Sequence, residues 1–218
     1  MAATPEEIRF YVDPRCPWCY QTSRWARRLE ALGEVSIDWR PFSLEVVNKG
    51  DDGRRAPDSG SAPALRLLTA VRAGFGSEAA GTFYSAIAGA VHEQGAEVDD
   101  PAALGAALLA AGVDENFAAD VLRDPLSWDA VLAEHDAVVE EHRAFGVPTI
   151  LLATGEVMFG PIIVDVPDDT EAVELWRHFT WLTRNSNFAE LKRSRTALPD
   201  LESIRRYRAQ RAKKAAAA

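Results

Sequence analysis

The sequence predicts an α/β fold with an all-helical subdomain inserted into it. A strand–helix–strand pattern occupies residues 8–39, and residues 65–145 then show helical spacing or composition without a strand pattern. Strand-like composition returns over residues 146–159, ahead of one more amphipathic helix. Such an order is typical of one α/β domain interrupted by a helical one. The expected units are a discontinuous α/β domain of residues 1–57 and 146–200, a helical subdomain of residues 58–145, and a C-terminal extension of residues 201–218.

The N-terminal unit is expected to be a right-handed βαβ unit. Apolar and polar residues alternate over residues 8–12, which indicates a strand with one buried face. The next segment, residues 17–32, has an apolar stripe at helical spacing, and Gly33 suits the left-handed residue that ends a helix. Alternation over residues 35–39 predicts the second strand.

The middle of the chain is expected to be a surface loop followed by helices. Residues 48–62 are polar and rich in Gly, Asp and Pro, which favours a loop. The helices are expected over residues 65–73, 79–92, 101–111, 115–122 and 128–145.

A β-hairpin and a helix are expected to complete the fold. Pro148 stands at the head of a short apolar run that ends at Leu152, and proline is tolerated at a strand start. A turn containing Gly155 leads into a second strand over residues 156–159. An amphipathic helix over residues 172–182 follows, with Thr170 near its cap. The basic end of the chain is expected to be a solvated extension.

The only two cysteines of the 218 residues lie three apart, at the junction between the first strand and the first helix. Proline favours the first helical position, so Pro17 makes Cys16 the N-cap residue. The Cys16 sulfur then faces the free N–H groups of Trp18 and Cys19, which favours a thiolate with a pKa of roughly 3.5–7.5 instead of about 8.5. We therefore predict a redox pair in which Cys16 attacks and Cys19 resolves.

Three other interpretations of the cysteines are weaker. Two cysteines cannot complete a four-ligand zinc site, and no histidine lies near them in the sequence, so no metal is expected. A disulfide across a two-residue gap would stabilise the fold little. Two inert buried cysteines remain an alternative, although the proline at the helix start argues against it.

Composition restricts the partners. A net charge of −9 and a pI near 5.0 argue against general nucleic-acid binding. No apolar stretch approaches 18 residues and no signal-peptide pattern is visible, so we expect a cytoplasmic protein that does not span a membrane. No glycine-rich dinucleotide fingerprint or phosphate loop is present, so no tightly bound nicotinamide or flavin is implied.

The element order, Cys16-Pro17-Trp18-Cys19 and the Pro148 segment together resemble the DsbA-like thiol oxidoreductases. This resemblance implies a thioredoxin fold with an inserted helical domain. It further implies a cis Val147–Pro148 bond facing the cysteines, a Val147 backbone that pairs with a bound thiol substrate, and Thr149 close by. Pro17 and Trp18 would complete the substrate-binding surface, with Trp18 at its opening.

A narrower resemblance, to the actinobacterial mycothiol-dependent nitroreductases, rests on residues 13–25, 91–95, 159–161 and 190–196. It implies a reductase that takes electrons from the small thiol mycothiol and passes them to a small nitro-type or disulfide acceptor. The inserted helices would then cover the cysteines, and His92 would border the cleft. The chain departs from the pattern at Tyr20, where Trp is common, and in its basic end after Leu198.

Alternatives of other classes stay open at this point. One is a DsbA-type protein disulfide oxidant or isomerase, and another is a thiol-dependent hydroxychromene-carboxylate isomerase with the same inserted fold. A third is a non-enzymatic interaction module with a vestigial cysteine pair. The oligomeric state, a homodimer included, is not determined by the sequence.

Overall fold

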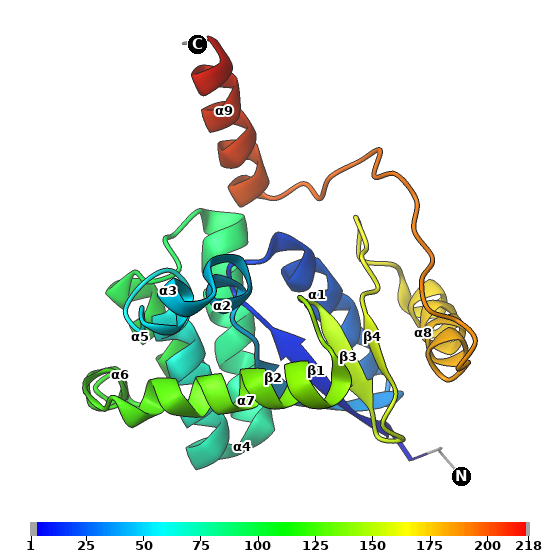
Figure 1. Ribbon diagram of the computed structural model, residues 1–218, viewed down its shortest axis with the longest axis horizontal. Coiled ribbons are helices and arrows are strands. Elements are labelled where there is room, and N and C mark those ends of the chain that lie inside the picture. The colour runs from blue at the N-terminus through cyan, green and yellow to red at the C-terminus, as the bar shows by residue number, and fades with distance from the viewer. Residues whose placement is uncertain (1–3, 217–218) are drawn as a thin grey trace.

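The computed structural model describes residues 4–216, so residues 1–3 and 217–218 of the first and last expected units lie outside the described part. A four-stranded sheet with the order β2-β1-β3-β4 forms its centre (Figure 1). Strand β1 pairs in parallel with β2 and antiparallel with β3, and β3 continues antiparallel into β4. The strands are β1 (Glu6–Val12), β2 (Val35–Pro41), β3 (Thr149–Leu152) and β4 (Val157–Phe159).

Helices α1 (Pro17–Ala31) and α8 (Asp169–Thr183) pack on each other. Trp25 of α1 joins them, because its indole N–H donates to the Ala172 carbonyl at 3.1 Å and its ring meets Trp176 and Phe179 of α8. Phe10 sits at the centre of the sheet, paired with Trp39 on one side and Ile150 on the other. The expected α/β framework, a DsbA-like thioredoxin fold, is present.

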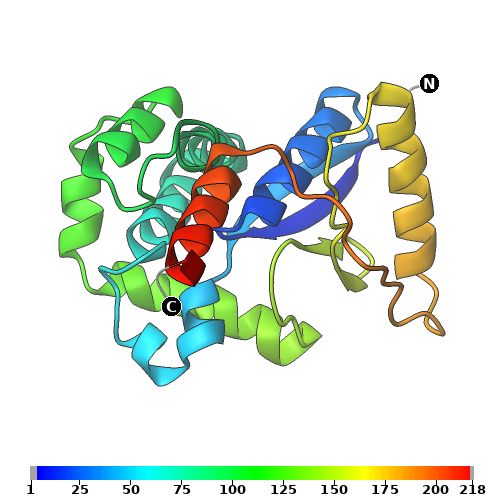
Figure 2. The same cartoon turned by 90° about the horizontal axis from the view of Figure 1, so that it is seen from above.

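The helical subdomain is inserted between β2 and β3 and lies to one side of the sheet, opposite α8 (Figure 2). Its longest helix packs against β2, and the last helix of the group also contacts that strand. The elements are α2 (Leu44–Lys49), α3 (Asp51–Arg54), α4 (Ala62–Gly89), the π-helical turn η1 (Ala90–Gln94), α5 (Pro101–Ala110), α6 (Phe117–Arg123) and α7 (Leu126–His142).

Buried Arg66 fastens the start of α4 to the segment around α6. Its side chain is 3% exposed and donates to the backbone carbonyls of Val121, Leu122 and Asp124 as well as to the Ser127 hydroxyl and Asp58. These acceptors compensate for the desolvation of the guanidinium.

Two local expectations are wrong. The expected loop over residues 48–62 contains α3 and the end of α2, because the Ser43 hydroxyl caps α2 by accepting the Val46 N–H. The helices expected over residues 65–73 and 79–92 are parts of α4 and η1, with α4 interrupted only at Gly76, whose φ of 88° suits glycine. Asp168 is the N-cap residue of α8, and Thr170 lies near this cap, as expected.

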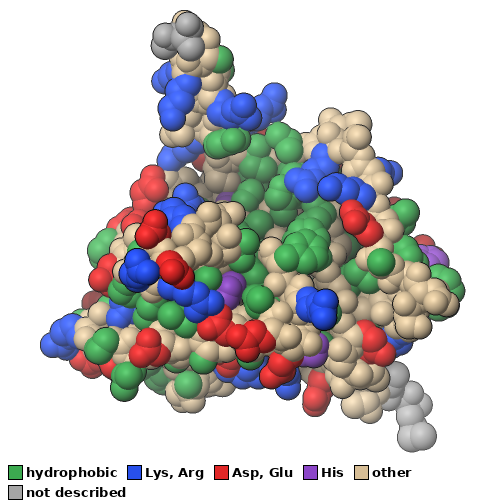
Figure 3. All heavy atoms as spheres, in the orientation of Figure 1, with side chains coloured by type: hydrophobic (Ala, Val, Ile, Leu, Met, Phe, Trp, Pro, Cys, Tyr) green, Lys and Arg blue, Asp and Glu red, His purple; other side chains and the backbone are tan. Residues whose placement is uncertain are grey.

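The C-terminal end is only partly solvated, contrary to expectation. Helix α9 (Glu202–Ala216) projects from the body and carries a row of Lys and Arg side chains (Figures 1 and 3). Its base is docked, because Leu201 and Ile204 are buried and Arg206 donates to the Gly95 carbonyl at 2.6 Å. Between residues 4 and 216, no helix has both the length and the apolar character that a membrane crossing needs.

Candidate active site

Cys16 is the N-cap residue of α1, as the Pro17 position predicts. Its backbone is extended, with φ −87° and ψ 112°, and its Sγ accepts the Cys19 N–H at 3.4 Å. Pro17 occupies the start of the helix, where a backbone N–H would have no partner in the helix. The sulfur therefore lies at the positive end of α1.

The segment before β3 meets this sulfur from the other side. The Val147–Pro148 bond is cis, and the Cys16 thiol donates to the Val147 carbonyl at 3.7 Å. The Thr149 hydroxyl is buried and donates to the Gly146 carbonyl at 2.7 Å. The Val147 carbonyl is therefore brought to Cys16, while the Thr149 side chain bonds within the turn that follows.

Cys19 is completely buried one turn into α1. Its thiol lies 3.9 Å from the Tyr11 carbonyl, and the Tyr84 hydroxyl donates to its sulfur at 3.5 Å. Both cysteines are free thiols. Sequence reasoning did not single out Tyr84, since an aromatic residue on an inserted helix carries no sign of its partner 65 residues earlier.

The expected thiolate at Cys16 is wrong for this closed arrangement. Burial raises the pKa of the Cys16 thiol to about 11, and the carboxylate of Asp13 adds to the increase. The N–H groups of Cys19 and Trp18 and the Arg195 guanidinium act in the opposite direction but do not compensate. The sequence reveals that Cys16 lies at a helix terminus. It does not reveal the distant segments that bury this terminus and leave Cys16 only 9% exposed. Burial also raises the pKa of Cys19 well above its usual value.

Asp13 fixes the loop between β1 and α1 to the helical subdomain. Its carboxylate accepts the Arg15 and Leu44 N–H groups and the Ser61 hydroxyl, each at 2.9 Å. Burial raises the pKa of Asp13, and these three donors oppose the increase. The loop that carries Cys16 is therefore attached to two residues of the inserted segment.

His92 lies behind the same loop. Pro14 offers only its carbonyl, so His92 Nε2 must carry the proton that bonds to it at 2.9 Å, and Nδ1 accepts from the Ser203 hydroxyl at 2.8 Å. The ring is 1% exposed and stacks on Tyr20 at 5.3 Å, and burial lowers its pKa to about 4. His92 thus connects η1, the motif loop and the base of α9.

The C-terminal segment that carries Arg195 also contacts the Cys16–Cys19 motif. The Arg195 guanidinium lies 4.8 Å from the centre of the Trp18 ring, which is half-buried between the cysteines. A cation over an indole face is an attractive contact. The sequence gives no sign of this pairing, because a basic residue in a polar tail is indistinguishable from a solvated one.

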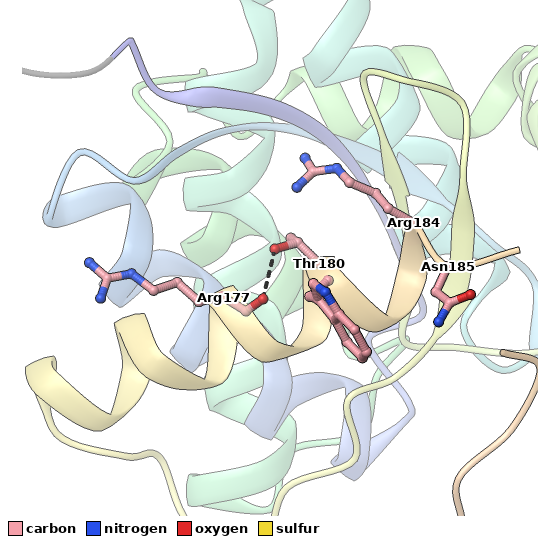
Figure 4. A pocket seen from close by; sticks show the side chains of 5 residues that line it. Arg177, Thr180, Arg184 and Asn185 are labelled. Carbon is pink, nitrogen blue, oxygen red and sulfur yellow. Dashed lines mark hydrogen bonds between the residues drawn. The ribbon is translucent and has the colours of Figure 1, made fainter.

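Two surface hollows lie outside the cysteine pair. One, of about 440 Å³, follows α8 beside Thr180 and Arg184 (Figure 4). Arg184 already pairs with Glu6 there. The other, of about 390 Å³, lies beside Arg24 and Leu201. Among the residues that the structure describes, no three His, Cys, Asp or Glu side chains gather as metal ligands would.

Comparisons with known proteins show which family this chain resembles. The Rv2466c-like family model, described as mycothiol-dependent nitroreductase Rv2466c, matches residues 15–193. Protein Rv2286c of Mycobacterium tuberculosis is 34% identical over 200 residues, which cover 90% of this chain and 85% of that protein.

Solved structures share the fold at low sequence identity. The cytosolic disulfide reductase DsbM from Pseudomonas aeruginosa has a TM-score of 0.58 at 15% identity, covering 80% of this chain and 99% of that one. A 2-hydroxychromene-2-carboxylate isomerase has a TM-score of 0.59 at 17% identity, covering 84% and 100%. From the extent of the family match, this chain belongs to the Rv2466c-like family of mycothiol-dependent nitroreductases and is a thiol–disulfide oxidoreductase with a DsbA-like fold.

Proposed function

We propose that this protein is a mycothiol-dependent reductase of small nitro-type or disulfide acceptors, with Cys16 as the attacking and Cys19 as the resolving cysteine. The observation that carries the proposal is the place of the Cys16 sulfur, between the N-terminus of α1 and the Val147–Pro148 turn. Cys16 is the more exposed of the two thiols, while Cys19 lies directly beneath it. The family match supports mycothiol as the electron donor.

The cycle balances with two electrons. With a disulfide acceptor, the Cys16 thiolate displaces one acceptor thiol and forms a mixed disulfide. Cys19 then attacks the Cys16 sulfur, releases the second thiol and leaves a Cys16–Cys19 disulfide. One mycothiol thiolate opens this disulfide at Cys16, and a second displaces the first as mycothiol disulfide, which restores both thiols. A nitro acceptor would take two electrons and two protons from the same dithiol.

The surrounding residues have defined parts in this proposal. Pro17 and Trp18 line the approach to the Cys16 sulfur, and the Val147–Pro148 backbone aligns the bound thiol. Thr149 and His92, expected from the sequence to bind substrate, act through the backbone, because Thr149 bonds to the Gly146 carbonyl and His92 to the Pro14 carbonyl. No tightly bound cofactor is required by this cycle.

A cytoplasmic location fits a dithiol that must be kept reduced. The DsbA-type alternative would place a protein on Cys16 in place of a small thiol. The isomerase alternative would not need Cys19, so it predicts turnover without that residue. Whether the protein acts as a monomer or a homodimer does not enter the chemistry.

The test is a Cys19→Ser variant expressed in a mycothiol-producing host, with the intact mass of the purified protein measured under non-reducing conditions. A mycothiol-sized adduct on Cys16 is the expected result, because the resolving step is removed. Cys16→Ser is the matched control and should carry none. Adducts with proteins alone would favour the DsbA-type alternative, and an unmodified Cys19→Ser protein would overturn the proposed roles.

A further inference from the structure

Tyr84 brings a hydroxyl group to the buried sulfur of the cysteine pair. It lies on α4, in the inserted subdomain, and is completely buried. Its hydroxyl donates to Cys19 Sγ at 3.5 Å, and its ring stacks on Trp39 with centroids 5.4 Å apart. Trp39 in turn abuts Gly81 one turn earlier on α4, where a Cβ atom would overlap the indole. The Tyr84 ring is therefore held against Trp39, whose indole is itself confined by Gly81.

We propose that Tyr84 is a catalytic residue of the resolving step, because its hydroxyl donates a hydrogen bond that stabilises the Cys19 thiolate. This inference rests on the proposed roles of Cys16 and Cys19. The sulfur of Cys19 has no access to water, so a thiolate there lacks the solvation that stabilises charge. A hydrogen bond donated to an ionised sulfur supplies part of that stabilisation.

The step in question converts a mixed disulfide into the intramolecular one. Cys19 loses its thiol proton, and its sulfur attacks Cys16 Sγ. The bond between Cys16 and the bound thiol breaks, and the departing thiolate takes up the proton that Cys19 has lost. Cys16 and Cys19 are oxidised to a disulfide, and the departing group is reduced. Tyr84 keeps its own proton throughout. Its hydroxyl donates a hydrogen bond to Cys19 Sγ while that sulfur carries the negative charge.

Tyr84 is the side chain that donates a hydrogen bond to Cys19. Burial, Cys16 and the Asp13 carboxylate oppose a negative charge on Cys19, whereas the Tyr84 hydroxyl and a backbone hydrogen bond from Asp13 favour that charge and lower its pKa. Burial and the neighbouring Cys19 raise the pKa of Tyr84 well above its usual value, so the phenol stays protonated. Arg27 also lies near Tyr84, and its guanidinium packs on the face of Trp39, 5.1 Å from the centre of the ring.

The experiment uses the reduced full-length protein and the aromatic disulfide dithiobis(nitrobenzoate) in stopped-flow absorbance. Attack by Cys16 releases one nitrothiobenzoate in a fast phase, and attack by Cys19 on the resulting mixed disulfide releases the second. Tyr84→Phe should leave the first phase unchanged and slow the second about tenfold, the effect of about one unit in the pKa of Cys19. The pH profile of the second phase should move upward by about the same unit.

Thr69→Val is the matched control. Thr69 lies on the same helix and is buried, and its hydroxyl bonds only within α4, to the Leu65 carbonyl at 2.8 Å. This variant should keep both phases, so a slow second phase in both variants would assign the effect to disturbed packing and overturn the inference. An unchanged second phase in Tyr84→Phe would also overturn it.

Cys19→Ser separates this inference from the proposed function. Loss of the second phase in Cys19→Ser upholds the resolving role whatever Tyr84→Phe does. Retention of the second phase in Cys19→Ser would refute the resolving role itself, and with it any part for Tyr84.

Discussion

Acidification is expected to destabilise this protein through two buried histidines, one of which supports the motif loop. His92 and His135 are 1% and 3% exposed, and burial lowers the pKa of each to about 4 from an ordinary value of 6.5. In unfolded chains both rings take up protons near their ordinary pKa. The unfolded state therefore binds more protons than the folded state between these two values. The histidine contribution to stability is complete above about pH 6.5 and is lost as the pH falls toward 4.

The magnitude follows from the two pKa values. For one site with a folded pKa of about 4 and an unfolded pKa of about 6.5, lowering the pH from about 7 to about 5 removes roughly 2 kcal/mol from the free energy of unfolding. Both histidines together remove roughly 4 kcal/mol, a large part of the 5–15 kcal/mol that is typical of a folded domain.

The assay is urea unfolding followed by tryptophan fluorescence at each pH. His92→Gln keeps an amide N–H that can reach the Pro14 carbonyl but does not titrate. His135→Asn is the matched control away from the motif, because its side-chain oxygen can still accept the Ser43 N–H. Each variant should show about half of the wild-type loss between pH 7 and pH 5. A His92→Gln variant as acid-sensitive as the wild type would refute the assignment of a depressed pKa to His92.

Two further predictions concern Cys16 and Arg66. Because burial raises the pKa of the Cys16 thiol to about 11, its alkylation by iodoacetamide, followed by mass spectrometry, should still accelerate between about pH 8 and about pH 10. A rate that levels off at about pH 9–10 would show an ordinary pKa instead, and a rate that is constant above about pH 8 would show a depressed one. Arg66→Met should lower the free energy of unfolding by about 3 kcal/mol, because six carbonyl, hydroxyl and carboxylate partners lose their buried donor. The exposed Arg123→Met control should change it by less than about 0.5 kcal/mol in the same urea titration, and equal effects would contradict the anchoring role of Arg66.

Local sequence patterns predict the framework of the site well. Pro17 places Cys16 at a helix N-cap, and the apolar run after Pro148 places a strand beside β1. Both inferences depend on short-range preferences that a few residues determine. The resemblance adds the cis Val147–Pro148 bond, which the structure contains.

The environment of the cysteines depends on long-range contacts that the sequence does not reveal. Tyr84 reaches Cys19 from the part of α4 that follows the Gly76 interruption, and Arg195 reaches Trp18 from a polar tail. The burial that these contacts produce reverses the expected direction of the shift in the Cys16 pKa. Helix-dipole reasoning from residues 16–19 omits the desolvation that distant segments impose, and desolvation is the larger effect here.

The distance along the chain between Cys16 and its carbonyl partner has a consequence during synthesis. Val147 follows Cys16 by 131 residues, so a ribosome working at about 5–20 residues per second makes it roughly 10 s after Cys16. For that interval the nascent chain carries the helix-capping Cys16 thiol without the Val147 carbonyl that it bonds to in the folded protein. The Cys16 sulfur can then meet the thiols and disulfides of the surrounding solution before the mature site exists. Enclosure of Cys16 is therefore a late event in the synthesis of each molecule, which requires the Val147–Pro148 turn to have left the ribosome.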